Sequence, residues 1–120
     1  MADTTNPLPL FDEFLLHLQT NNYSPETMYN YEKDLLVFTY FINNDINKDF
    51  KDLTKRDIEK YKAYLLSNDR KTATLDQKSQ VRLQSGSINR FLSSLRSYLK
   101  FLIYQDFPIP IQPELIKMVR

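Results

Sequence analysis

Residues 85–105 read SGSINRFLSSLRSYLKFLIYQ, and the spacing of their apolar side chains decides the predicted fold. Apolar residues recur there every three or four positions, which places them on one face of an α-helix. They are Ile88, Phe91, Leu92, Leu95, Leu99 and Leu102. The pattern predicts an amphipathic helix over about residues 87–105, capped by Ser85 or Ser87, that buries one face in a protein core.

Two earlier stretches have the same helical spacing. Residues 8–21 predict a first helix with apolar side chains along one face. A second helix is expected to begin at Pro25 and to run to about residue 43. Ser24 is a good N-cap for it, and proline at the first helical position loses no hydrogen bond because that N–H has no partner within a helix.

A third helix is expected after Thr54, which can cap it. Asp57 stands three positions later and makes a weaker form of the capping box. This helix is predicted to end near residues 67–69, and the polar residues 70–85 that follow are predicted to form a mobile loop.

The end of the chain differs in composition. FPIPIQP at residues 107–113 blocks helix formation, and a last short helix is expected over about residues 114–119. The sequence therefore predicts an all-α protein, a compact bundle of four helices with a short C-terminal helix. We expect a disordered N-terminus over residues 1–7, a helical domain over residues 8–106 and a linker over residues 107–120.

Composition argues against several classes of protein. The chain has one Gly and no Cys, which disfavours glycine-rich phosphate loops and excludes disulfides and thiolate metal sites. The N-terminus lacks the pattern of a signal peptide and no apolar run is long enough to span a membrane, so a cytoplasmic location is expected.

Catalytic constellations are also missing from the pattern. His17 is the only imidazole, and no Ser or Cys nucleophile is arranged around it in the sequence. Asp12 and Glu13 are adjacent, so they do not share a helix face, and both are interpreted as solvated acids near a helix start. We therefore predict no catalytic residues, no metal, no cofactor and no small-molecule ligand.

The net charge of +1 hides an uneven distribution. Residues 1–69 carry seven basic and twelve acidic side chains, whereas residues 70–100 carry seven basic side chains and one acid. The basic segment includes the helix predicted over residues 87–105. Its excess of positive charge is the kind of electrostatic feature that nucleic-acid-binding proteins display.

One face of this helix combines basic and polar side chains at helical spacing. Asn89, Ser93, Arg96 and Lys100 fall on it, and Arg90 lies beside it. Lys and Arg bind phosphates, while Asn and Arg read base edges in a major groove that admits a helix. A solvated basic face without any partner is the alternative interpretation.

The start of the second helix is a weaker candidate. Ser24, Thr27, Asn30 and Lys33 lie there, and a helix N-terminus favours phosphate, although the nearby acids Glu26 and Asp34 disfavour it. The alternative is that Ser24 only caps the helix. Gly86, the only glycine, either lets a phosphate approach the backbone or eases a turn.

Three segments resemble those of tyrosine site-specific recombinases. YSPETMYNYEKDLLVFTYF at 23–41 resembles S-x-x-T-x-x-x-Y-x-x-D-L-x-x-F, and LTKRDIEKYKAYL at 53–65 resembles L-T-x-x-D-I-x-x-Y-x-x-x-L. SGSINRFLSSLRSYLKFLIYQ at 85–105 resembles S-x-x-S-I-N-R-x-L-S-x-L-R-x-F-Y-x-F-L. In order and spacing, residues 8–120 resemble the N-terminal, SAM-like core-binding domain of Xer-type recombinases and phage integrases, which is a compact orthogonal bundle.

The resemblance implies that the chain clamps double-stranded recombination-site DNA, while a separate C-terminal domain cuts and rejoins strands. It implies other recombinase protomers as partners. Thr20 stands three positions after His17, so the catalytic His-x-x-Arg pattern is not present there, and none of the eight tyrosines is interpreted as the nucleophile. The DNA contacts that the resemblance implies are Thr27, Asn30, Ser87, Asn89, Arg90, Ser93, Arg96 and Lys100.

Residues 107–120 resemble the linker that enters the catalytic domain. The chain is therefore expected to be a fragment of a recombinase, with a stand-alone protein as the alternative. A second functional hypothesis is a helical protein-interaction module that does not bind DNA. Its docking surface would use the apolar residues of the C-terminal segment, Phe107, Ile109, Ile111, Leu115 and Ile116.

Overall fold

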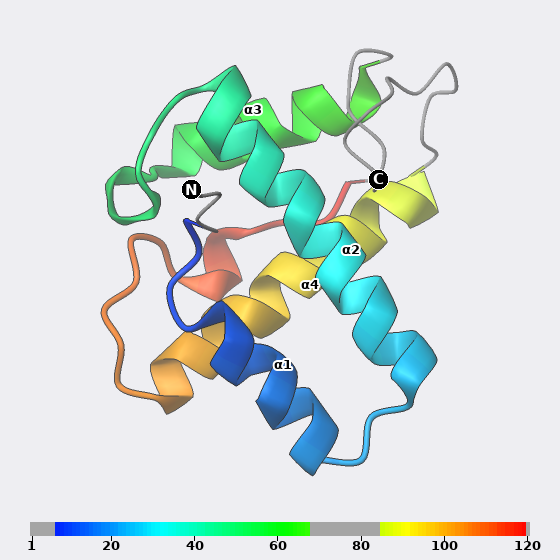
Figure 1. Ribbon diagram of the computed structural model, residues 1–120. Helices are drawn as coiled ribbons and strands as arrows, with labels where there is room; N and C mark the ends of the chain where they lie inside the picture. The colour runs from blue at the N-terminus through cyan, green and yellow to red at the C-terminus, as the bar shows by residue number, and fades with distance from the viewer. Residues whose placement is uncertain (1–6, 68–84, 120) are drawn as a thin grey trace.

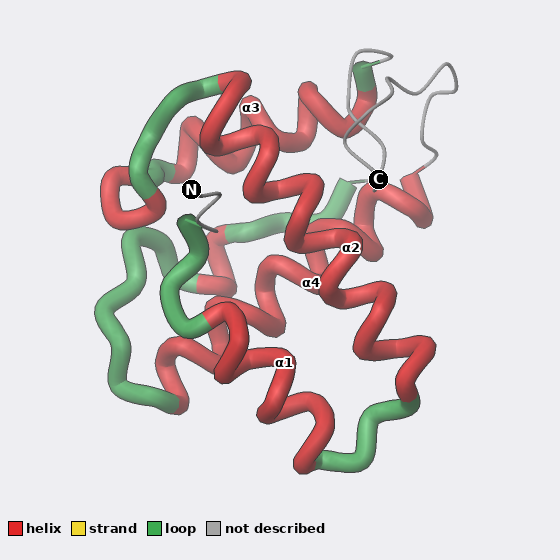
Figure 2. Tube along the Cα trace, viewed as in Figure 1, coloured by secondary structure: helices red, strands yellow, loops and turns green. Residues whose placement is uncertain are grey.

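The computed structural model describes residues 7–67 and 85–119, and these residues form helices and loops without a strand (Figures 1 and 2). The α-helices are α1 (Phe11–Thr20), α2 (Pro25–Tyr40), α3 (Lys55–Leu66) and α4 (Ser85–Tyr104). Three short helices accompany them, the π-helix η1 (Phe41–Asp45) and the 3₁₀ helices η2 (Phe50–Asp52) and η3 (Pro113–Leu115). The predicted all-α four-helix fold is confirmed.

Helices α2 and α4 cross at the centre of the molecule, as Figure 1 shows. Helix α1 packs on α2, and α3 packs on α4. Five of the six apolar side chains that α4 was predicted to bury lie in this centre, because Ile88, Leu92, Leu95, Leu99 and Leu102 are each at most 1% exposed. The sixth, Phe91, is only partly buried against the core. The long amphipathic helix therefore organises the core, as its spacing predicts.

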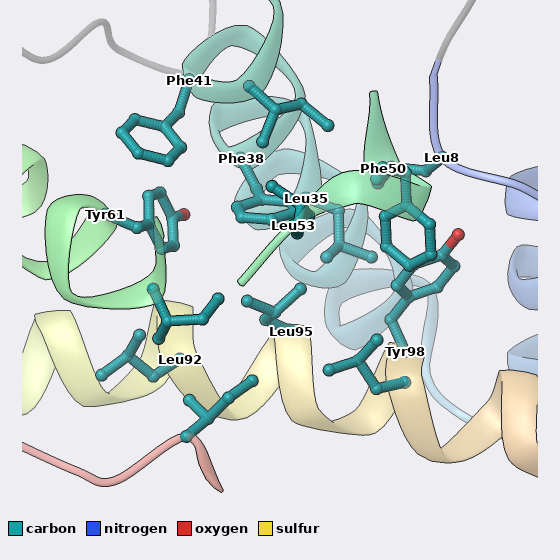
Figure 3. Close-up of a cluster of buried hydrophobic side chains, with 14 of the residues drawn as sticks. Leu8, Leu35, Phe38, Phe41, Phe50, Leu53, Tyr61, Leu92, Leu95 and Tyr98 are labelled. Atoms are coloured by element: carbon teal, nitrogen blue, oxygen red, sulfur yellow. The ribbon is translucent and has the colours of Figure 1, made fainter. Parts of the chain in front are cut away.

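The core is rich in aromatic rings (Figure 3). Phe38 of α2 and Tyr61 of α3 meet edge to face with ring centroids 4.9 Å apart, and Phe41 lies 5.0 Å from the same Tyr61 ring. Such pairs add to the stability that the buried area supplies. Tyr98 of α4 packs on Phe50 of η2, so the short 3₁₀ helix also belongs to the core.

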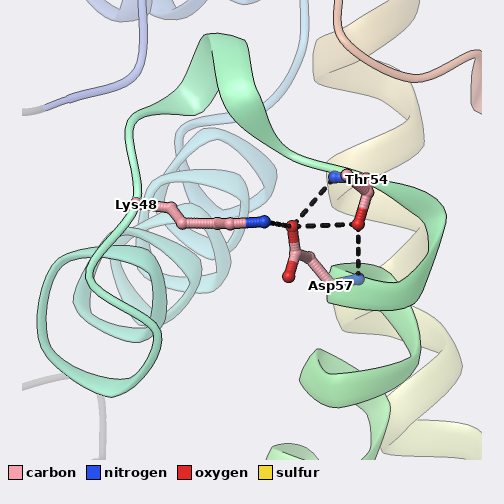
Figure 4. Close-up of polar contacts among 3 residues, drawn as sticks. All are labelled: Lys48, Thr54 and Asp57. Atoms are coloured by element: carbon pink, nitrogen blue, oxygen red, sulfur yellow. Dashed lines mark hydrogen bonds and ion pairs between the residues drawn. The ribbon is translucent and has the colours of Figure 1, made fainter.

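The predicted helix starts at Ser24 and Thr54 are confirmed. The Ser24 hydroxyl accepts a hydrogen bond from the N–H of Thr27 at 3.1 Å, and Pro25 occupies the first turn of α2. Thr54 and Asp57 form a complete capping box, in which Asp57 Oδ2 accepts from the Thr54 N–H at 2.9 Å and Thr54 Oγ1 accepts from the Asp57 N–H at 3.3 Å (Figure 4).

Lys48 joins this capping box from the preceding loop. Its Nζ lies 2.7 Å from Asp57 Oδ2, and the Asp57 side chain is 2% exposed. Burial by itself raises the pKa of Asp57, but the hydrogen bonds from Lys48 and Thr54 and the charge of Lys48 outweigh it, so the pKa of Asp57 is lowered. The start of α3 is therefore fixed by a buried charged group.

Several boundaries differ from the predictions. Helix α1 begins at Phe11 instead of residue 8, because Leu10 has a left-handed backbone with φ 55°, which a helix cannot include. Helix α2 ends at Tyr40, and the predicted continuation through residue 43 takes the form of the π-helix η1. Of the loop predicted over residues 70–85, all but Ser85 lies outside the described residues, and Ser85 begins α4. Of the disordered N-terminus predicted over residues 1–7, all but Pro7 lies outside them.

The short helix predicted over residues 114–119 is present, but its predicted length is wrong. Only Pro113–Leu115 form a 3₁₀ turn, and Ile116 leaves it with extended backbone. The physical reason is tertiary, since Ile116 is 1% exposed and Val119 pairs its backbone with a side chain of α4. Those contacts replace the hydrogen bonds that a helix would supply.

Candidate nucleic-acid interface

The outer face of α4 carries basic and polar side chains and no acid. Asn89, Ser93, Arg96 and Lys100 follow one another along α4 beside the buried leucine face, at spacings of three and four residues. Ser93 and Lys100 are exposed, and Arg96 is half-buried. The sequence of α4 contains neither Asp nor Glu, so its own side chains do not neutralise these cations.

Arg90 lies on the flank of this face and is paired with a buried acid of α2. Its Nη2 is 2.9 Å from Asp34 Oδ1, and Ser94 Oγ donates to Asp34 Oδ2 at 2.7 Å. The Asp34 side chain is 2% exposed, whereas that of Arg90 is 52% exposed. Asp34 therefore holds one end of the guanidinium against the protein while half of the Arg90 side chain faces solvent.

A second contact joins α2 and α4 nearer the start of α2. The hydroxyls of Tyr31 and Ser97 are 3.4 Å apart. Thr27 and Asn30 precede Asp34 by seven and four residues, so all three lie along one flank of α2. The side chains of Thr27 and Asn30 are half-buried, and the Thr27 hydroxyl accepts a hydrogen bond from the Ser24 hydroxyl at 2.9 Å. The structure thus brings the two groups of predicted site residues onto neighbouring helices.

Asn89 makes contacts that the sequence does not predict. Its Nδ2 donates to the carbonyl oxygen of Val119 at 2.9 Å, and its Oδ1 accepts from the Val119 N–H at 2.7 Å. Ser93, one turn further along α4, has its Oγ 4.0 Å from the sulfur of Met118. The end of the chain therefore lies beside the first half of the α4 face.

The second half of the face has a different environment. The Nε of Arg96 is buried without a hydrogen-bond partner among the described residues. Lys100 lines a cavity of about 310 Å³ together with His17, Ser97 and Tyr104. His17 packs against Phe101 and Tyr104, with ring centroids 5.0 Å and 5.8 Å away. The only histidine is thus part of an aromatic cluster at the end of α4.

Gly86 and Ser87 lie in the first turn of α4. Gly86 has no positive φ, and a Cβ added to it would meet nothing within 4 Å. Gly86 therefore does not supply a left-handed turn, because its own backbone is helical and leaves room for a side chain. Gly86 is exposed and Ser87 is half-buried.

Sequence reasoning missed the partners of two residues. Asp34 looks in the sequence like an acid that disfavours phosphate, but it is buried and paired with Arg90, which stands 56 positions later. Asn89 looks free to contact DNA, but it pairs with Val119, 30 positions later. A sequence motif gives the residue type at each position but not its partner in the fold. Neither pairing can therefore be predicted from local spacing.

Within residues 7–67 and 85–119, no group of three His, Cys, Asp or Glu side chains could hold a metal ion. No helix in that part of the chain is both long and apolar enough to cross a lipid bilayer.

Comparison with known proteins agrees with this architecture. The family model of the phage integrase N-terminal SAM-like domain matches residues 11–106. No curated protein matches the chain. The N-terminal domain of a phage integrase/site-specific recombinase from Haloarcula marismortui has a similar structure, with a TM-score of 0.71, 16% sequence identity, and coverage of 98% of this chain and 100% of that one. At that identity the structural likeness shows a shared fold. Since the family model spans most of the chain, the protein belongs to the phage integrase N-terminal SAM-like domain family.

Proposed function

We propose that this chain binds duplex DNA as the core-binding domain of a tyrosine recombinase or integrase. Strand cleavage and exchange would be carried out by a separate catalytic domain, in an assembly with further recombinase protomers. The observation that carries the proposal is the acid-free outer face of α4, on which Arg96 and Lys100 follow one another at helical spacing. Arg90 adds a third cation on the flank.

The chemistry of this face suits the DNA backbone and the major groove. Lys100 is an exposed point charge for a phosphate, and the half-exposed guanidinium of Arg90 offers further donors beside its bond to Asp34. An α-helix fits into the major groove, where Arg can read guanine. Thr27 and Asn30 lie along one flank of α2, and α2 would be the second helix that contacts the same duplex.

The test compares two double variants that remove the same charge. In Arg96→Ala/Lys100→Ala, both cations leave the α4 face. In the control Lys51→Ala/Lys55→Ala, both cations leave η2 and the start of α3, where Lys51 is already close to Asp49 and Asp52. Fluorescence anisotropy with a labelled random-sequence duplex at several salt concentrations measures affinity and its salt dependence.

We expect the α4 variant to bind more weakly than the wild-type chain. The slope of log affinity against log salt should become shallower by about 0.9 for each phosphate that the variant no longer neutralises. The control variant should keep most of the wild-type slope. Equal effects of the two variants, or no binding by the folded wild-type chain, would contradict the proposal. Circular dichroism confirms that each variant is folded.

The alternative of a protein-interaction module finds less support. Of the five apolar residues that it uses, Ile111 is 6% and Ile116 1% exposed, and Phe107 and Ile109 pack partly against the core. Leu115 is the one that is 40% exposed. Ile111 and Ile116 are therefore unavailable to a partner, whereas Phe107 and Ile109 line an open cavity of about 530 Å³ together with Phe50.

A further inference from the structure

We propose that residues 116–119, here called the C-terminal strap, compete with DNA for the first half of the α4 face. The proposal rests on the proposed function, because it concerns how that face becomes accessible. It makes the strap a built-in inhibitor of DNA binding by this domain. Figure 1 shows the segment running back along the first half of α4 toward the start of that helix.

The chemistry of Asn89 carries the proposal. Its amide uses both its N–H and its oxygen on the backbone of Val119, at 2.9 Å and 2.7 Å. An asparagine that reads adenine in the major groove uses the same two groups in the same bidentate manner. Asn89 can therefore hold the strap or a base edge, but it cannot hold both at once.

Contacts beside Asn89 show how far the strap extends over the face. Met118 reaches Ser93, with its sulfur 4.0 Å from Ser93 Oγ, and Met118 and Val119 are both partly buried against the core. A helix placed in a major groove brings its outer face against base edges and phosphates. The strap occupies the space that such a duplex needs at Asn89 and Ser93.

The strap is buried to different degrees along its length. Ile116, at 1% exposure, anchors its beginning in the core, whereas Val119 is held through the amide of Asn89. Release of residues 118 and 119 from α4 and from their partial burial, with Ile116 in place, would free Asn89. The apparent affinity for DNA is the affinity of the released form multiplied by the fraction of molecules in which the strap is released. A docked strap therefore lowers the apparent affinity.

The first experiment removes one strap hydrogen bond without touching the DNA face. Val119→Pro lacks the N–H that donates to Asn89, and the control Val119→Ala keeps it. Asn89, Ser93 and every basic side chain remain. We expect Val119→Pro to bind a random-sequence duplex about twofold to tenfold more tightly than Val119→Ala, as loss of one hydrogen bond from the docked state predicts.

The second experiment locks the strap in place. The chain has no cysteine, so Ser93→Cys/Met118→Cys creates a single pair of thiols, one on α4 and one on the strap, which a short reducible bis-thiol cross-linker joins. The same protein is then compared in its cross-linked form and after reduction. We expect weaker DNA binding when the strap is locked and recovery of the affinity on reduction.

The outcomes separate the two proposals. If the variants bind DNA but Val119→Pro matches Val119→Ala, the strap does not compete, and DNA uses the Arg96 and Lys100 half of α4 with the strap in place. If no folded variant binds DNA, the proposed function itself is overturned and the strap proposal falls with it. Tighter binding by Val119→Pro supports both.

Discussion

Asp34 and Arg90 show how one buried charge depends on its partner. The Asp34 carboxylate is 2% exposed and takes hydrogen bonds from Arg90 and Ser94, so its burial is compensated. The interaction also ties α2 to α4 at their crossing. Arg90 consequently has a structural role whether or not it contacts DNA, and its removal tests folding as well as binding.

We predict that Arg90→Ala lowers the free energy of unfolding by about 2 kcal/mol, because it leaves Asp34 buried beside Ser94 alone. Loss of a partner from a fully buried pair costs about 3–5 kcal/mol, and the 52% exposure of Arg90 lets water reduce that cost. Urea denaturation of Arg90→Ala, Asp34→Asn and the double variant measures it. Additive effects of the two substitutions would contradict the coupling.

Two core tyrosines make a matched pair at the same scale. Tyr61 is fully buried and its hydroxyl has no partner among the described residues, whereas the Tyr98 hydroxyl donates to the carbonyl of Pro9. Burial raises the pKa of both phenols, so neither ionises near neutral pH. The two tyrosines differ in whether the buried hydroxyl has a hydrogen-bond partner.

We predict opposite effects when each hydroxyl is removed. Tyr61→Phe should raise the free energy of unfolding by up to about 1 kcal/mol, because an unsatisfied polar group leaves the core. Tyr98→Phe should lower it by about 1 kcal/mol, because the Pro9 carbonyl loses its donor. Thermal unfolding followed by circular dichroism measures both. A loss of stability in Tyr61→Phe would mean that its hydroxyl has a partner in solution.

At the scale of the element, local sequence predicts helix starts better than helix ends. Ser24 and Thr54 cap α2 and α3 through hydrogen bonds to residues three positions later, so their signals are complete within one turn. The beginning of α1 depends on the left-handed backbone of Leu10, and the extended end of the chain depends on contacts with α4. Neither the left-handed backbone of Leu10 nor the contacts of the chain end with α4 can be predicted from the spacing of apolar residues.

The capping box of α3 predicts a dependence of stability on pH. The pKa of Asp57 is lowered in the folded protein, so its stabilising contribution is present above its unfolded pKa and is lost as pH falls through its folded pKa. We expect the free energy of unfolding to fall between about pH 5 and about pH 2, and less steeply in Asp57→Asn. The control Asp52→Asn changes an acid whose side chain is 59% exposed and should keep the wild-type dependence. Parallel curves for the wild type and Asp57→Asn would show that Asp57 does not supply this dependence.

At the scale of the whole molecule, the candidate interface could be predicted in part. The basic face of α4 follows from residues 89–100 alone, because helical spacing groups Asn89, Ser93, Arg96 and Lys100 on one side. What lies against that face does not follow from them. Val119 contacts Asn89 and Asp34 contacts Arg90 only because the tertiary fold brings these distant residues together. Neither contact follows from the local sequence.

The C-terminal segment is predicted to contribute to the stability of the whole domain. Ile116 is 1% exposed and Leu115, its neighbour, is 40% exposed, which makes them a matched pair. Ile116→Ala should lower the free energy of unfolding by about 2–4 kcal/mol, because it leaves a cavity in the core. Leu115→Ala should change it by less than about 1 kcal/mol, as surface substitutions do.

Urea denaturation measures the free energy of unfolding of both variants. It is followed by circular dichroism and by tyrosine fluorescence, because the chain has no tryptophan. The two signals should change together, because Ile116 packs into the same core as the leucines of α4. Equal, small effects of Ile116→Ala and Leu115→Ala would mean that this segment leaves the core in solution. The strap would then have no anchor on α4, and it could not limit access of DNA to Asn89.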